Sequence, residues 1–200
     1  QRLREWGYEV TSLDISKSSG ADICTNILTW RYKTHFPPGY FEVIAAGVPC
    51  DQYSAAHTVG PRNLALADRL VKRTLDIIHY FNPKLWWIEN PRSSLLKSRV
   101  FMRGIPFLDV DYCRFSEWGY QKPTRIWGSA AISHLENMVC NGRCGNMVQR
   151  FGKLEHRQRL GGNNMQNSTR GKGQVPKLLV DYLLRAVTDK EPPPLFAVQT

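Results

Sequence analysis

Two repeating arrangements of apolar and polar residues alternate along the chain, and together they predict an α/β fold. Residues 41–48 and 85–88 are continuous apolar runs, which is typical of buried strands in a parallel sheet. Between these runs, apolar residues from Leu64 to Ile78 recur about every 3.6 residues, which predicts an amphipathic helix. A strand, a helix and a second strand in this order predict a parallel pair joined by a helical crossover.

Other segments complete the predicted sheet. Residues 8–15 have the composition of a strand, and residues 110–115 and 124–127 predict an antiparallel hairpin. Residues 175–187 predict a last amphipathic helix. Apolar periodicity is absent from residues 129–172, where Gly, Asn, Arg and Gln dominate. We therefore expect a mostly parallel sheet with one antiparallel hairpin and a small polar insertion.

The charge of the chain adds a candidate partner. Lys and Arg number 27 and Asp and Glu number 17, so the net charge is +10. Residues 143–172 hold seven basic residues and one acidic residue. A basic surface of this kind favours a polyanion, most often nucleic acid, although many basic proteins bind nothing specific.

Composition also limits the cellular environment. No apolar stretch approaches the ~18 residues that cross a bilayer, and residues 1–6 carry no signal-peptide pattern. The five cysteines are an odd number, which argues against a disulfide framework. We expect a soluble intracellular protein in a reducing compartment, the nucleus or the cytoplasm.

Three chemically useful residues lie at or just past the ends of predicted strands, namely Asp14, Cys50 and Glu89. Ligands of α/β sheets bind beyond these carboxyl ends. Cys50 is placed like a nucleophile, although most free cysteines are small buried apolar residues. Glu89 ends an apolar strand, where desolvation favours a protonated carboxyl that serves as a general acid, unless it is a solvated turn residue. Arg125 begins a strand as a fixed charge, or is a surface arginine.

Four motifs occur in an order and spacing that resemble the cytosine-C5 DNA methyltransferase family. Pro49-Cys50-x-x-Tyr53-Ser54 resembles its catalytic loop, and Glu89-Asn90 resembles its Glu-Asn-Val motif, with Pro91 replacing Val. Gln121-x-x-x-Arg125 resembles Gln-x-Arg-x-Arg, with Pro123 at the first arginine. Gly171-x-Gly173-Gln174-Val175-Pro176 resembles the closing motif. The short chain is most similar to compact, phage-type or mobile-element members.

The resemblance implies a DNA (cytosine-5)-methyltransferase that uses S-adenosylmethionine. The target cytosine is flipped out of the duplex, and Cys50 attacks ring carbon 6. Glu89 protonates N3, Asn90 orders the loop, and Arg125 holds the base carbonyl oxygen. Carbon 5 then takes the methyl group, and loss of its proton releases Cys50.

The resemblance also implies the binding residues. Those for the cofactor are Asp14, Ile15, Asp22, Ile23, Pro49, Gln174 and Val175. Those for phosphates are Ser54, Arg143, Arg150, Lys153, Arg157, Arg159, Arg170 and Lys172.

The expected architecture is a Rossmann-like S-adenosylmethionine-dependent methyltransferase fold. Residues 1–128 are its catalytic core, 129–170 a target-recognition-like segment and 171–190 the closing helix. The family's Phe-x-Gly-x-Gly loop and the strand before it are not in this chain, so we expect an N-terminally truncated fold. Two other functions stay open: an inactive methyltransferase-like subunit that binds nucleic acid or acts as a scaffold, and an RNA cytosine-5 methyltransferase.

We predict no metal site from the sequence. Cys140 and Cys144 are weak candidates for two zinc ligands, with His134 or His156 nearby. Zinc sites more often show two spaced pairs of ligands, and the alternative is a turn with two free thiols.

Overall fold

A four-stranded sheet forms the centre of the protein, in the order β3-β4-β6-β5. The computed structural model describes residues 1–54, 57, 60–158 and 174–193. The strands are β3 (Val43–Gly47), β4 (Leu85–Pro91), β5 (Phe107–Asp111) and β6 (Pro123–Gly128). β3 and β4 are parallel, whereas β6 is antiparallel to both of its neighbours. The predicted α/β class is confirmed.

The strand directions agree with the expected mostly parallel sheet with one antiparallel hairpin, and the order of the strands makes the sheet mixed. Strands β3, β4 and β5 run in one direction, but β6 lies between β4 and β5, so only one of the three neighbouring pairs is parallel. The predicted antiparallel hairpin is present as β5 and β6. Its first strand ends at Asp111, because Tyr112–Arg114 form a 3-10 helix. The sheet is therefore mixed.

The crossover helix α3 (Leu64–Phe81) covers one face of the sheet. Its first turn is capped by Asn63, whose side chain accepts a hydrogen bond of 3.0 Å from the amide of Leu66. Asn82 ends the helix in a left-handed conformation with φ of 45°. The predicted apolar stripe packs against Ile88 of β4 and Trp127 of β6, among others.

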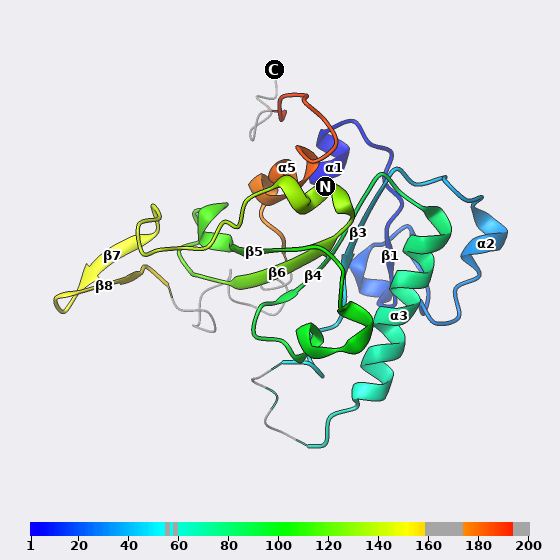
Figure 1. The fold of residues 1–200 in the computed structure, drawn as a ribbon, viewed down its shortest axis with the longest axis horizontal. Coiled ribbons are helices and arrows are strands. Elements are labelled where there is room, and N and C mark those ends of the chain that lie inside the picture. Colours follow the sequence, from blue (N-terminus) through cyan, green and yellow to red (C-terminus); the bar gives the residue numbers. More distant parts are fainter. Residues whose placement is uncertain (55–56, 58–59, 159–173, 194–200) are drawn as a thin grey trace.

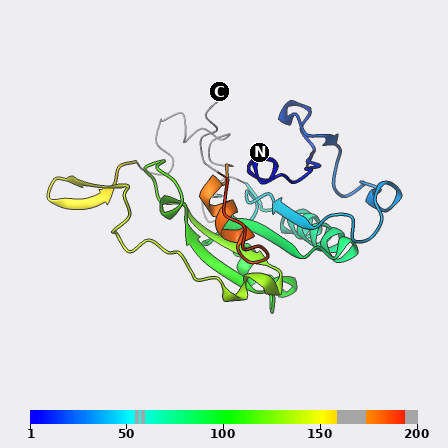
Figure 2. The ribbon, with the colours of Figure 1, turned by 90° about the horizontal axis from the view of Figure 1, so that it is seen from above.

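Helices α1 (Arg2–Glu5) and α5 (Lys177–Leu184) cover the opposite face, so the sheet is a middle layer (Figures 1 and 2). The buried Arg2 guanidinium joins them by donating to both carboxylate oxygens of Asp181, at 2.6 and 2.8 Å. The indole of Trp6 donates to the same carboxylate at 2.7 Å. The two short helices are therefore fixed by one buried acid.

Smaller elements surround this core. β1 (Leu13–Asp14) and β2 (Ile23–Cys24) form a separate parallel pair, much shorter than the strand predicted over residues 8–15. α2 is Tyr32–His35. The 3-10 helices are Lys17–Ser19, Leu95–Ser98, Val100–Met102, Tyr112–Arg114 and Ala130–His134.

The polar insertion contains an antiparallel hairpin of β7 (Met147–Arg150) and β8 (Lys153–His156). Figure 1 shows this hairpin projecting away from the central sheet. Phe151 at its tip is fully exposed and has a φ of 47°, beside Gly152 at 75°. Positive φ at both central residues is the conformation of a type I′ turn, whose twist matches that of paired strands. In the described part of the chain, no helix has the length and apolarity needed to span a membrane.

Candidate active site

The loop after β3 carries Cys50, and Tyr53 anchors this loop. The Tyr53 side chain is completely buried, and its hydroxyl donates to Asp68 of α3 at 2.8 Å. Arg99 also donates to Asp68, which keeps the carboxylate paired. Within the loop, the amide of Tyr53 donates to the carbonyl of Cys50 at 3.0 Å. The motif tyrosine therefore fixes the turn that presents the cysteine.

Arg62 clamps the far side of the same loop. Its guanidinium donates to the carbonyls of Gln52, Ser54 and His57, at 2.9, 2.7 and 3.2 Å. Five donors in a rigid planar arrangement suit this kind of multiple contact. One guanidinium thus holds three backbone carbonyls of the loop in place.

Asn90 of β4 is buried beside the strand that leads into the loop. Its amide nitrogen donates to the carbonyl of Val48 at 3.2 Å, two residues before Cys50. Its side-chain oxygen is buried with no partner among the described residues. This contact ties the end of β3 to β4.

Glu89 is placed by its own strand next to Asn90 and receives two donors. The hydroxyl of Tyr112 and the ammonium of Lys122 both donate to Oε1, at 3.0 and 3.2 Å. The side chains of Glu89 and Lys122 are 13% and 11% exposed, so this ion pair is largely shielded from water. Burial and the charge of Glu89 raise the pKa of Tyr112, so its hydroxyl stays a donor.

Cys50 lies within the electrostatic reach of this pair. Burial is the main reason that the pKa of its thiol is raised, and the charge of Glu89 raises it further. The ammonium of Lys122 acts in the opposite direction. Cys50 is nevertheless only partly buried, so its sulfur is not sealed in the core. A thiol, a carboxylate and an ammonium therefore influence one another near the end of β3.

The expectation that Arg125 joins this cluster is wrong. Asn90, Arg125 and Asp109 lie opposite one another across three strands, and Glu89 lies one residue before Asn90 in β4. Because successive residues of a strand point to opposite faces, Arg125 and Glu89 lie on different sides of the sheet. The Arg125 guanidinium instead binds both carboxylate oxygens of Asp109 at 2.8 Å. It also stacks 3.8 Å above the ring of Phe107.

The predicted cofactor residues differ in their availability. Asp14 is exposed at the end of β1, where one carboxylate oxygen accepts the amide of Ser16 at 2.7 Å. Ile15 beside it is 69% exposed. Asp22 is already engaged, because one of its oxygens accepts the amide and hydroxyl of Ser12 at 2.7 and 2.5 Å. These bonds lower the pKa of Asp22.

The other cofactor candidates are spread over three segments. Pro49 precedes Cys50, and Ile23 lies on β2. Val175 packs against the core beneath α5, whereas Gln174 is exposed. Asp14 and β1 are not part of the four-stranded sheet that carries Cys50 and Glu89.

The predicted phosphate contacts lie mainly around the β7–β8 hairpin. Arg143 and Lys153 are exposed. Arg150 is paired with Glu155 at 3.5 Å, and Arg157 donates to Asn146 at 2.8 Å, so both also stabilise the hairpin. Arg159, Arg170 and Lys172 lie outside the described residues.

Comparison with known proteins identifies one informative relative. The chain is 28% identical over 197 residues to a probable DNA (cytosine-5)-methyltransferase of Frog virus 3 (isolate Goorha). This similarity covers 89% of each of the two chains. The predicted resemblance to the cytosine-C5 methyltransferases is confirmed. No family model matches the chain.

Sequence reasoning on the methyltransferase motifs missed Lys122 and Tyr112. Lys122 stands inside the quoted Gln121-to-Arg125 motif, directly before β6, and this position was the available signal. Tyr112 carries no comparable signal, because only the folding of the chain after β5 brings its hydroxyl to Glu89. Lys122 is therefore the cation that contacts Glu89, whereas the sequence had named Arg125 as the cation of the site, in contact with the base carbonyl oxygen.

Proposed function

We propose that this chain transfers a methyl group from S-adenosylmethionine to carbon 5 of a cytosine in DNA. The observation that carries the proposal is that Glu89, in β4 opposite the last residue of β3, binds Lys122 and acts electrostatically on Cys50 in the loop after β3. The similarity to the viral relative across 89% of the chain supports the reaction type. The mixed α/β sheet is compatible with a Rossmann-like methyltransferase fold.

In the proposed reaction, Cys50 adds to carbon 6 of the extruded base, which makes carbon 5 nucleophilic. The thiol must first lose a proton, which burial and the charge of Glu89 both oppose by raising its pKa. A proton that moves from the thiol to Glu89 removes that charge and is then the proton needed at ring nitrogen 3. After methyl transfer, a water molecule takes the carbon 5 proton, and the electron pair of that C–H bond expels the Cys50 thiolate while the proton on nitrogen 3 returns to Glu89.

Lys122 and Tyr112 position the acid in this scheme. Both donate to Oε1 of Glu89, so Oε2 keeps its lone pairs for the ring edge of the base. Arg125 is bound by Asp109 on the other face of the sheet, so we assign the contact with the base carbonyl oxygen to Lys122. Asn90 orders the loop through its bond to the carbonyl of Val48.

The residues at the end of β1 fit the nucleoside part of the cofactor. Oδ2 of Asp14 is an exposed carboxylate oxygen that suits ribose hydroxyls, and the exposed Ile15 offers an apolar contact. Oδ2 of Asp22 already accepts two hydrogen bonds from Ser12, so Oδ1 is the atom left for a contact with the cofactor. When bound, S-adenosylmethionine supplies the electrophilic methyl group.

We propose that the basic segment holds the DNA backbone. Arg143 and Lys153 are exposed on the projecting hairpin and the loop before it. Basic side chains that neutralise phosphates release counterions from the DNA, so the affinity for DNA should fall as the salt concentration rises. Residues 129–170 then act as a target-recognition-like segment beside the catalytic core.

The test is transfer of a labelled methyl group from S-adenosylmethionine to duplex DNA. Cys50→Ser is expected to abolish transfer and to keep DNA binding, because it replaces only the nucleophilic atom. Cys24→Ser is the matched control, since Cys24 is exposed on β2. The same assay uses single-stranded RNA of equal sequence.

Each result has a defined meaning. Equal methylation by Cys50→Ser and the unchanged protein contradicts the covalent mechanism. Binding without transfer in the unchanged protein favours the inactive nucleic-acid-binding subunit. Faster transfer to RNA than to DNA favours the RNA methyltransferase.

A further inference from the structure

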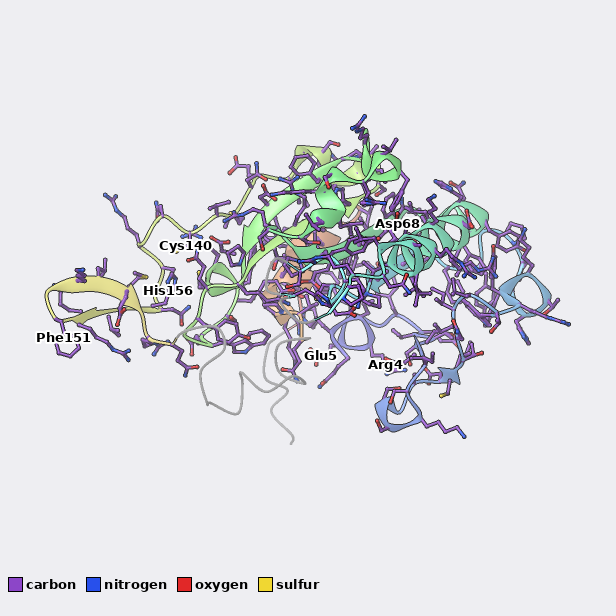
Figure 3. All side chains as sticks on the ribbon, turned by 90° about the horizontal axis from the view of Figure 1, so that it is seen from below. Arg4, Glu5, Asp68, Cys140, Phe151 and His156 are labelled. Atoms are coloured by element: carbon purple, nitrogen blue, oxygen red, sulfur yellow. The ribbon has the colours of Figure 1, made fainter. Side chains whose placement is uncertain are left out.

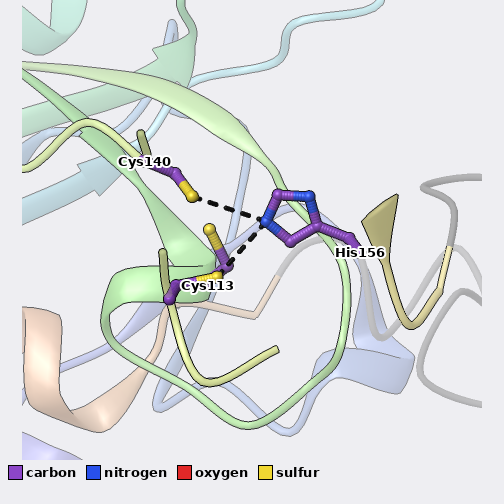
Figure 4. Close-up of side chains that lie close together, drawn as sticks. Cys113, Cys140 and His156 are labelled. Carbon is purple, nitrogen blue, oxygen red and sulfur yellow. Dashed lines mark hydrogen bonds between the residues drawn. The ribbon is translucent and has the colours of Figure 1, made fainter. Parts of the chain in front are cut away.

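Four metal-binding side chains from distant parts of the chain meet at the base of the β7–β8 hairpin. They are Cys113, Cys140, Cys144 and His156, and their ligand atoms all lie within 4.8 Å of one another. Cys113 is in the 3-10 helix after β5, and His156 ends β8. Figure 4 shows the thiol of Cys140 directed at the ring of His156, with Cys113 beside them. The candidate active site uses none of these residues.

The distances agree with the edges of a zinc tetrahedron. Nε2 of His156 lies 3.6 Å from Sγ of Cys140 and 3.4 Å from Sγ of Cys144. Zn–S bonds of about 2.3 Å and Zn–N bonds of about 2.0–2.1 Å at a tetrahedral angle separate sulfur and nitrogen by about 3.6 Å. All of the cysteines are free thiols.

Hydrogen bonds from the surrounding backbone and side chains hold the ligands in place. The amide of Gly142 donates to Sγ of Cys140 at 3.4 Å, and the amide of Cys140 donates to the buried Asp111 at 2.8 Å. Asn146, which is 3% exposed, donates to the carbonyl of Cys113 at 3.0 Å. Such outer contacts orient the ligands of metal sites.

Apart from the polar contacts of Arg150 and Arg157, the hairpin has little to stabilise it. β7 pairs only with β8 among the described strands. Two of its apolar residues, Phe151 and Leu154, are 102% and 58% exposed, so they bury little surface. An isolated two-stranded hairpin is marginally stable in water. Figure 3 places Phe151 at the distant tip, with Cys140 and His156 at the base, where a metal would fasten the hairpin.

We propose that Cys113, Cys140, Cys144 and His156 bind one Zn²⁺ as a structural site. Three thiolates and one imidazole are a ligand set that suits zinc. Four protein ligands leave no open position for water or substrate, so the metal fastens the hairpin and performs no catalysis. The proposal is independent of methyl transfer.

The experiment measures zinc in the purified full chain, kept under reductant. We expect one zinc ion per chain after incubation with one equivalent of Zn²⁺ and gel filtration. The variants Cys113→Ser, Cys140→Ser, Cys144→Ser and His156→Ala are each expected to lose most of this zinc. Cys24→Ser and His134→Ala are matched controls, because both side chains are exposed and lie outside the cluster.

Two further measurements separate loss of the site from loss of the fold. His156→Cys supplies a fourth thiolate and is expected to retain zinc, whereas His156→Ala does not. Replacing zinc by Co²⁺ in the unchanged protein should give the visible spectrum of a tetrahedral thiolate site. Chelation should increase amide hydrogen exchange in residues 147–156 and leave exchange in α3 unchanged.

Three results overturn the proposal. One is a reduced protein with five reactive thiols that retains no zinc. Another is full zinc retention in both Cys144→Ser and His156→Ala. The last is a disulfide among the three clustered cysteines that persists under reductant.

Discussion

The buried contact between α1 and α5 leads to a quantitative prediction. Arg2→Met removes the guanidinium but keeps most of the aliphatic side chain. Asp181 then loses two bonds, at 2.6 and 2.8 Å, and keeps only the donor from Trp6. The side chains of Arg2 and Asp181 are 3% and 5% exposed, so water cannot replace the lost donors.

The size of the effect follows from this burial. Removing one partner of a buried ion pair leaves an uncompensated charge and costs about 3–5 kcal/mol in the free energy of unfolding. For a chain of this length, each kcal/mol changes Tm by about 2–4 °C, so we expect Tm to fall by roughly 6–20 °C. Asp181→Asn should cost less, because Arg2 still binds Glu5 and the carbonyl of Pro193.

Urea unfolding followed by circular dichroism measures these differences. Arg4→Met is the matched control, since Arg4 lies in the same helix and pairs with Asp22 at 3.3 Å through exposed side chains. We expect no measurable change for it, because exposed ion pairs contribute little. If Arg2→Met lowers the free energy of unfolding by less than about 1 kcal/mol, the ion pair of Arg2 and Asp181 is not shielded from water as argued.

Three more predictions concern the sheet, the thiol and the basic hairpin. Gly128→Ala should destabilise the fold by about 1–3 kcal/mol, because the added Cβ would lie 2.7 Å from a backbone carbonyl oxygen. Gly47→Ala is the control, since a Cβ at that position meets open space. Thermal unfolding compares the two variants. Glu89→Gln should move the alkylation midpoint of Cys50 to lower pH, because it removes a charge that raises the thiol pKa; an unchanged midpoint places the two groups too far apart to interact. Lys153→Ala should make the negative slope of the log DNA-binding constant against the log salt concentration shallower by about 0.9. A slope identical to that of the unchanged protein excludes this phosphate contact.

Much of the fold follows directly from local sequence. The apolar run over residues 41–48 and the periodic stripe after Leu64 predicted β3 and α3, because each pattern matches the geometry of a single element. The insertion of β6 between β4 and β5 was not predictable in this way. Strand order depends on contacts between segments distant in sequence, which local periodicity does not encode.

The candidate site was likewise predicted from the sequence only in part. The motifs led to Cys50 and Glu89, since each residue follows a recognisable buried strand. Arg125 was misplaced because the face that a strand residue occupies depends on register, and a single position changes it. For the proposed zinc site, the sequence offered Cys140 and Cys144 with His134 or His156 nearby, but not Cys113, which joins the cluster through folding rather than through spacing.

The bond between Arg2 and Asp181 has a consequence for synthesis on the ribosome. The two residues are 179 positions apart, so one is made long before the other. At about 5–20 residues per second, translation of the intervening chain takes roughly 9–36 s. Throughout that interval, Leu3 and Trp6 have no α5 to pack against, although both contact the cluster that it completes. Docking of α1 is therefore a late event in biogenesis, and until then its apolar side chains are accessible to chaperones that act on nascent chains.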